Sequence, residues 1–217
     1  MTRFAILLDG PCHPGTALRE AMQGARVIAA DGGMRHAGPL GLTPELWVGD
    51  FDGTPDDLLA GNSTPREAYP TAKDATDGEI AVEAALSRGA SELVMVGSLG
   101  GGRVDHALGL VTLAVATAHA HGVTVALTDG RQWALPLLPG RPVRLARPGR
   151  VVSVIGLSDL SGLTLSGVRW ALDGADIPLG SSRTLSNEAV GPVHATLRAG
   201  RAVLVHGPGD GAPEPSA

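Results

Sequence analysis

Two aspartates stand two residues apart at the end of an apolar segment. The segment reads ELWVGDFDG, residues 45–53, and its acids are Asp50 and Asp52. Side chains alternate between the two faces of a strand, so both carboxylates would point the same way in an extended chain. Two like charges on one face repel each other unless a positive group lies between them. The spacing therefore predicts a bound cation beside these two acids.

Three further polar segments could contact the same ligand. Asp31 is followed by two glycines, residues 73–77 read KDATD, and residues 100–106 read GGGRVDH. Glycines let a backbone approach a phosphate closely, the first N–H groups of a helix are unpaired, and Arg103 can donate a fork of hydrogen bonds to phosphate oxygens. Acids beside phosphate-binding groups are typical of Mg²⁺ carried by a nucleotide. The carboxylates expected to hold Mg²⁺ are those of Asp31, Asp50, Asp52 and Asp77.

Each of these residues also has a purely structural explanation. Asp31 could shape a turn, and Asp77 could be a first-turn acid favoured by the helix dipole, inside a capping box formed by Thr76 and Glu79. The glycine run alone could be a flexible turn, because it contains neither a Walker A pattern nor G-x-G-x-x-G. His106 is more typical of a structural donor than of a catalyst. Four acids at the ends of strands, taken together, favour the metal.

An alternation of apolar strands and helical segments in residues 1–130 must position these groups. Strands buried on both faces and separated by helices predict an α/β fold, a mostly parallel sheet with flanking helices. Such sheets bind ligands beyond the carboxyl ends of their strands, where the acidic and glycine-rich segments fall. The expected strands are residues 3–10, 26–33, 45–53, 92–101 and 123–130, and the expected helices are residues 16–25, 76–90 and 103–122.

A different pattern begins at residue 131. Short β segments separated by Gly, Pro and Ser fill residues 131–207, which predicts a smaller all-β, sandwich-like domain. Residues 208–217 are predicted to form a disordered tail. The expected β segments are residues 141–149, 150–157, 162–172, 193–200 and 201–207.

Composition and charge exclude several classes of protein. The net charge of −5 and the absence of a basic run give no electrostatic basis for binding nucleic acid. The single cysteine, Cys12, allows no internal disulfide and fits a reducing compartment. The apolar run at the N-terminus is shorter than a signal peptide requires, and the longest apolar region is shorter than a membrane span. These features predict a soluble, cytoplasmic protein without a membrane partner.

Six motifs resemble those of the thiamine pyrophosphokinase family. AADGG, GDFDG, KDATDGEIA and GGRVDH occur in this order, and GVRWAL and TLSNEAVG continue the resemblance over nearly the whole chain except the tail. The resemblance implies an α/β ATP-binding domain, a β-sandwich domain, a homodimer, and transfer of pyrophosphate from ATP to the hydroxyl of thiamine. One departure is Gly53, where the family usually has serine. We expect Thr54 to cap the next helix instead, with Pro55 as its first residue.

The resemblance also implies roles for individual residues. Mg²⁺, Lys73 and Arg103 would supply positive charge to the phosphates, while Asp77 or Asp105 would orient the attacking hydroxyl. The residues expected to contact ATP are Gly32, Gly33, Lys73, Gly101, Gly102 and Arg103. The residues expected to contact thiamine are Trp170 by cation–π stacking, and Ser186 and Asn187 by hydrogen bonds to the aminopyrimidine edge.

Three alternatives stay open at this point. Trp170 could be a core residue of the sandwich. The enzyme could use another alcohol, such as a hydroxymethylpterin, although the S-N-E segment favours thiamine. The chain could instead be a non-catalytic sensor of thiamine or nucleotide, although the retention of every expected metal-site acid favours an enzyme.

Overall fold

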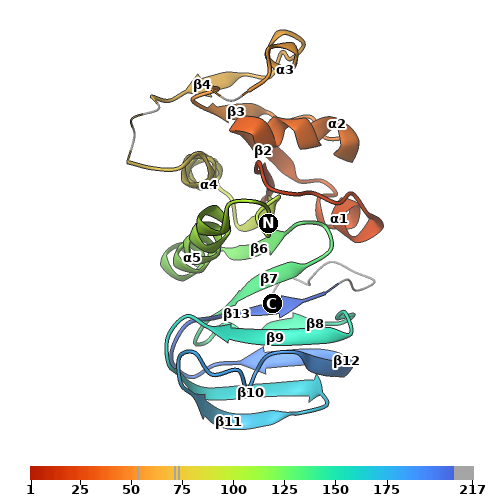
Figure 1. Ribbon diagram of the computed structural model, residues 1–217, viewed down its shortest axis with the longest axis vertical. Helices are drawn as coiled ribbons and strands as arrows, with labels where there is room; N and C mark the ends of the chain where they lie inside the picture. The colour runs from red at the N-terminus through yellow and green to blue at the C-terminus, as the bar shows by residue number, and fades with distance from the viewer. Residues whose placement is uncertain (53, 71, 73, 208–217) are drawn as a thin grey trace.

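The computed structural model describes residues 1–207 apart from residues 53, 71 and 73 (Figure 1). The expected phosphate ligand Lys73 and the expected tail, residues 208–217, therefore lie outside the described residues.

The first part of the chain forms a parallel sheet, as the sequence predicts. Its strands lie in the order β4-β3-β2-β1-β5-β6, and each neighbouring pair is parallel. The three-residue strand β4 was not expected, because all its side chains are exposed and it carries no apolar signal. The strands are β1 (Arg3–Leu7), β2 (Arg26–Ala30), β3 (Leu46–Gly49), β4 (Arg66–Ala68), β5 (Glu92–Val96) and β6 (Thr124–Thr128).

Helices cover both faces of this sheet (Figure 1). Alternate residues of β1 point to opposite faces, so Ala5 and Leu7 pack with α1, η1 and α2, whereas Phe4 and Ile6 pack with α4 and α5. The helices are α1 (Thr16–Ala21), the 3-10 helix η1 (Asp31–His36), α2 (Ala37–Leu40), α3 (Asp56–Ala60), α4 (Asp77–Ser87) and α5 (Val104–His121).

The second part of the chain is an antiparallel β region, also as predicted. All its strand pairings are antiparallel. Strand β7 was not expected, because Pro136 interrupts its pattern; in the structure Pro136 lies opposite Val203 of β13. The strands are β7 (Trp133–Leu137), β8 (Val143–Leu145), β9 (Val151–Gly156), β10 (Leu160–Val168), β11 (Leu172–Ile177), β12 (Asn187–Thr196) and β13 (Ala202–His206).

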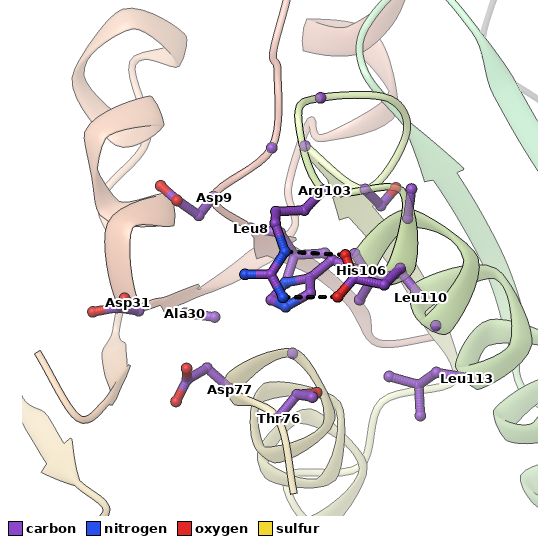
Figure 2. Close-up of a pocket in the computed structure, with 18 of the residues that line it drawn as sticks. Leu8, Asp9, Ala30, Asp31, Thr76, Asp77, Arg103, His106, Leu110 and Leu113 are labelled. Atoms are coloured by element: carbon purple, nitrogen blue, oxygen red, sulfur yellow. Dashed lines mark hydrogen bonds and ion pairs between the residues drawn. The ribbon is translucent and has the colours of Figure 1, made fainter. Parts of the chain in front are cut away.

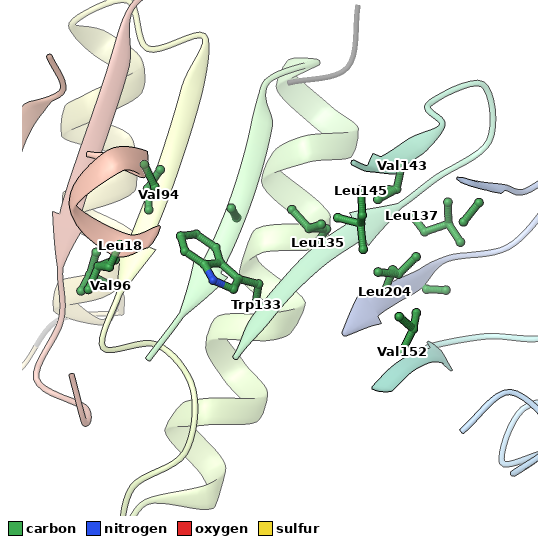
Figure 3. Close-up of a cluster of buried hydrophobic side chains, with 14 of the residues drawn as sticks. Leu18, Val94, Val96, Trp133, Leu135, Leu137, Val143, Leu145, Val152 and Leu204 are labelled. Carbon is green, nitrogen blue, oxygen red and sulfur yellow. The ribbon is translucent and has the colours of Figure 1, made fainter. Parts of the chain in front are cut away.

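The sheet and the core both continue from the first part into the second. Strand β7 pairs antiparallel with β6, with Thr128 opposite Trp133. Trp133 is buried between the α/β side chains Val94 and Val96 and the β-region side chains Leu135 and Leu137 (Figure 3). Hydrogen bonds and apolar contacts therefore join residues on the two sides of position 130. The division into domains 1–130 and 131–207 stays a prediction. None of the described helices is long and apolar enough to span a membrane.

Candidate functional site

A cavity of about 1090 Å³ lies at the carboxyl ends of β1, β2 and β5, where α4 and α5 begin (Figure 2). This volume is at the upper end of the range for small-molecule sites. The cavity is therefore large enough for a nucleotide. The expected site residues that line it are Asp31, Asp77, Gly101, Gly102, Arg103 and Asp105.

Glycines bring the ends of β1 and β5 together at this cavity. The Gly10 N–H donates to the Gly97 carbonyl oxygen at 3.1 Å. A Cβ atom on Gly10 would lie only 2.2 Å from that oxygen, so any other residue would force the two strand ends apart. Both glycines line the cavity, which therefore presents backbone atoms rather than bulky side chains on this wall.

Asp31 is held at the end of β2 by two neighbours from the third strand and the loop after it. Its φ of +43° lies in the left-handed region, which is unfavourable for a residue other than glycine. The indole N–H of Trp47 donates to the Asp31 carbonyl oxygen at 2.9 Å. The hydroxyl of Thr54 donates to Asp31 Oδ1 at 2.8 Å. The carboxylate of this cavity-lining residue is thus held in place.

The expected cap of α3 by Thr54 is wrong. Helix α3 begins at Asp56, its N-cap is Pro55, and no side chain caps it. The Thr54 hydroxyl is instead used by Asp31, on a different strand. The cap expected for α4 is confirmed on its Thr76 side, because the Thr76 side chain accepts the Glu79 N–H at 3.3 Å and the helix begins at Asp77.

Asp50 and Asp52 lie in a turn and not in an extended strand. Strand β3 ends at Gly49, and Phe51 has a φ of +62°. Asp50 Oδ1 accepts the backbone N–H of Asp52 at 3.2 Å. The premise that strand alternation aims both carboxylates at one cation is therefore wrong. Among the described residues, those that line the cavity do not include Asp50 or Asp52.

The acids in the described part of the chain do not form a preassembled metal cage. Among the described residues, no group of three or more His, Cys, Asp or Glu side chains is arranged to hold a metal ion. Mg²⁺ bound to a nucleotide needs only one or two carboxylates, because phosphates and waters complete its six oxygen ligands. Asp31 and Asp77, which line the cavity, supply oxygen donors of the right chemistry for that smaller requirement.

Arg103 and Asp105 form a two-point ion pair at the start of α5 (Figure 2). Arg103 Nε donates to Asp105 Oδ1 at 3.0 Å and Arg103 Nη2 donates to Oδ2 at 2.7 Å. The hydrogen bonds from Arg103 hold the pKa of the Asp105 carboxyl well below its usual range. Asp105 is therefore an ionised partner of Arg103, and a phosphate that binds Arg103 must compete with it or use the remaining N–H groups.

Asp9 and Arg35 also line the cavity and were not foreseen. Arg35 forms an ion pair with Asp9 and donates to the Gly10 carbonyl oxygen at 3.3 Å. His36 Nε2 lies 3.0 Å from the same oxygen, and burial lowers the pKa of this imidazole. Asp9 follows β1 as Asp31 follows β2, so the rule that located Asp31 could also have located Asp9.

The two glycines after Asp31 do not line the cavity among the described residues. A Cβ on Gly33 would lie 2.1 Å from the Leu7 carbonyl oxygen, and a Cβ on Gly32 would lie 2.2 Å from Asp9 Oδ1. The absence of a side chain at both positions therefore allows η1 to pack against the end of β1. A contact with ATP stays a prediction for them.

Trp170 lies in the β region, on the surface and outside the cavity. Its exposed fraction of 55% rules out the alternative that it is a core residue. The buried side chain of Asn187 accepts the Trp170 N–H at 3.1 Å and donates to the Trp170 carbonyl oxygen at 2.8 Å. Asn187 also accepts the Glu188 N–H at 2.9 Å. The structure thus brings two of the expected thiamine-binding residues together.

The surroundings of Trp170 leave its indole partly covered. The Arg169 guanidinium lies 5.3 Å from the centre of the indole, and Glu188 pairs with Arg169 at 3.2 Å. Ser186, the third expected contact, has a φ of +54° and its N–H donates to Ser153 Oγ at 2.9 Å. The segment before Asn187 is therefore held in a specific backbone conformation.

Two family models match the chain in succession. The catalytic domain of thiamin pyrophosphokinase matches residues 19–127, and the vitamin B1 binding domain of thiamin pyrophosphokinase matches residues 142–203. The chain belongs to the thiamin pyrophosphokinase family. Both family segments were expected from the sequence, and the family assignment is confirmed. The catalytic segment of this family member supplies most of the cavity, and the vitamin-binding segment supplies Trp170 and Asn187.

Individual relatives are similar to this chain in sequence or in fold. The thiamine pyrophosphokinase of Bacillus subtilis is 28% identical over 155 residues, which cover 69% of this chain and 72% of the relative. The crystal structure of thiamine pyrophosphokinase from B. subtilis superposes with a TM-score of 0.82 at 23% identity and covers 95% of this chain and 99% of that one. The Geobacillus thermodenitrificans enzyme gives 0.78 at 25% identity, with 95% and 97% covered.

Proposed function

We propose that the chain transfers the pyrophosphoryl group of ATP to the hydroxyl of thiamine, which gives thiamine diphosphate and AMP. The observation that carries this proposal is the succession of a catalytic and a vitamin B1 binding segment, with a large cavity at the strand ends of the catalytic segment. Thiamine-dependent formation of AMP from ATP tests it. A protein that binds thiamine and ATP without turnover would be a sensor instead.

The polar part of the cavity is the proposed site of the ATP phosphates. The N–H groups at the start of α5, with Gly101 and Gly102 before them, can approach phosphate oxygens without steric hindrance, and Arg103 adds positive charge. Asp31 and Asp77, which line the cavity, are the proposed ligands of Mg²⁺. Asp50 and Asp52, on the neighbouring turn, stay predicted further ligands. Mg²⁺ would supply neutralisation of the charge on the phosphoryl oxygens.

Positioning and charge neutralisation account for the proposed reaction. The thiamine hydroxyl oxygen loses its proton to solvent and forms a bond to the β-phosphorus as the bond from that phosphorus to the bridging oxygen of the α-phosphate breaks. AMP leaves with the electron pair of the broken bond. Asp105 is committed to Arg103 by two hydrogen bonds. We propose that Asp77, whose side chain faces the cavity (Figure 2), orients the attacking hydroxyl.

Thiamine is proposed to stack on the exposed indole of Trp170. A cationic aromatic ring gains from contact with the π-face of an indole. Because Trp170 does not line the cavity of its own chain, we propose that a homodimer brings the β region of one chain to the cavity of the other. Mixing an Asp50→Asn protein with a Trp170→Ala,Asn187→Ala protein, at a thiamine concentration well below the KM of the second protein, should then raise activity above the sum of the two proteins assayed separately, through heterodimers. No such rise under confirmed subunit exchange would contradict the shared site.

The proposed setting is the cytoplasm, in line with the single cysteine of the chain. A pterin alcohol is the competing acceptor. The match to a vitamin B1 binding domain favours thiamine over it. Comparing AMP formation with thiamine and with a hydroxymethylpterin separates the two acceptors, and equal rates would contradict the choice of thiamine.

A further inference from the structure

The hydroxyl of Thr54 makes a partly buried contact with a carboxylate of the cavity. Thr54 is 7% exposed, and its Oγ1 donates to Asp31 Oδ1 at 2.8 Å. Thr54 follows β3, whereas Asp31 follows β2, so the bond joins the ends of two neighbouring strands. A hydrogen bond to a charged acceptor in a buried setting is stronger than one between neutral groups. The bond therefore restricts the orientation of the Asp31 carboxylate.

Trp47 holds the backbone of the same aspartate. Trp47 is fully buried, and its indole N–H donates to the Asp31 carbonyl oxygen at 2.9 Å. This bond supports the left-handed backbone of Asp31, which costs free energy unless the surroundings fix it. The Trp47 ring also meets Phe51 edge-on, with centroids 5.1 Å apart. Trp47 thus connects Asp31 with the turn that carries Asp50 and Asp52.

We propose that Thr54 is a positioning residue that orients the Asp31 carboxylate for a nucleotide-bound divalent cation. A carboxylate that accepts one bond at Oδ1 retains acceptor capacity at Oδ2 for a cation. Such partners behind a metal ligand set its orientation and contribute measurably to metal affinity. Among the described residues no side chain caps α3, and the Thr54 hydroxyl bonds Asp31 and not the start of the neighbouring helix. This inference rests on the metal role proposed for Asp31.

The test is binding of Mn²⁺, as a spectroscopic substitute for Mg²⁺, in the presence of a non-hydrolysable ATP analogue. Thr54→Val keeps the shape of the side chain and removes the hydroxyl, whereas the control Thr54→Ser keeps the hydroxyl. Electron paramagnetic resonance titration should show Mn²⁺ affinity about 10- to 100-fold weaker for Thr54→Val and close to wild type for Thr54→Ser. The KM for thiamine should stay unchanged, and thermal unfolding should show that the variants are folded.

A double-mutant cycle separates positioning from a general loss of structure. In an Asp31→Asn background, Thr54→Val should weaken Mn²⁺ binding no further, because the oriented carboxylate is already absent. Thr54→Ala makes the same comparison if Thr54→Val does not fold. Mn²⁺ affinity of Thr54→Val within twofold of wild type would overturn the inference. Equal Mn²⁺ affinity of wild type and Asp31→Asn would overturn the metal role of Asp31 and, with it, this inference. The proposed transferase activity is tested separately, by measuring AMP formation.

Discussion

Replacing Asn187 by alanine should disturb Trp170 before any ligand binds. Asn187 is 4% exposed, and its amide makes three hydrogen bonds, to Trp170 N, Trp170 O and Glu188 N. A typical hydrogen bond contributes about 0.5–1.5 kcal/mol net, so losing three of them should cost about 1.5–4.5 kcal/mol of unfolding free energy. Urea denaturation at constant m-value measures this loss. The matched control is Ser186→Ala, which leaves the backbone bond from Ser186 to Ser153 in place.

The same variant tells a positioning residue from a thiamine contact. With two oxygen acceptor sites used and one of its two N–H groups engaged, the Asn187 amide has little capacity left for a ligand. Acrylamide quenching reports mainly on Trp170, because Trp47 and Trp133 are buried. We expect altered quenching in ligand-free Asn187→Ala and no change in Ser186→Ala.

Thiamine kinetics complete this prediction. Loss of cation–π stacking in Trp170→Ala should raise the KM for thiamine about 2- to 30-fold, from about 0.5–2 kcal/mol. If Asn187 acts through Trp170, the double variant should have the KM of Trp170→Ala alone. Native quenching together with additive effects on KM would refute the positioning role and favour a direct contact between Asn187 and thiamine.

Three further changes test other parts of the site and the fold. Asp50→Asn should lower kcat by at least about a hundredfold with the fold intact, because losing a metal contact removes several kcal/mol of transition-state stabilisation. A kcat within a few-fold of wild type would remove Asp50 from the metal site. Asp105→Asn should release Arg103 and tighten binding of a non-hydrolysable ATP analogue about two- to fivefold at low salt, as for other exposed ion pairs; calorimetry showing unchanged or weaker binding would contradict the competition. Burial lowers the pKa of His206, so the folded state favours the neutral imidazole and stability should fall as pH drops below the ordinary histidine pKa of about 6.5. His206→Gln should therefore lose less unfolding free energy than wild type between about pH 7.5 and pH 5, and equal losses would contradict this assignment.

Local patterns in the sequence identified the fold because the elements are locally regular. Apolar runs marked β1, β2, β3, β5 and β6, and the Thr76 cap marked the start of α4. Strand β4 was missed because its three residues are exposed, and β7 was missed because Pro136 interrupts it. The sequence did not predict that the sheet continues from β6 to β7. The helical segments end near residue 130, and this change of pattern suggested a domain boundary there.

The details of the site depended on backbone turns and distant partners. The left-handed φ of Phe51 ended the extended geometry on which the Asp50 and Asp52 argument relied. The Thr54 hydroxyl bonds a residue 23 positions away, so local capping rules assigned it wrongly. Asp105 was one of two acids, with Asp77, expected to orient the attacking hydroxyl. In the structure Asp105 pairs with Arg103 two residues away, a contact that spacing alone does not predict.

The fate of each ATP phosphate tests the central claim most directly. ATP labelled separately at the β- and γ-phosphorus is incubated with the protein, Mg²⁺ and thiamine, and the products are separated by chromatography. The proposed reaction predicts that both labels appear in thiamine diphosphate, in amounts equal to the AMP released, and that omission of thiamine abolishes AMP release. Formation of ADP with only the γ-label transferred, or binding of both substrates without any transfer of label, would contradict it.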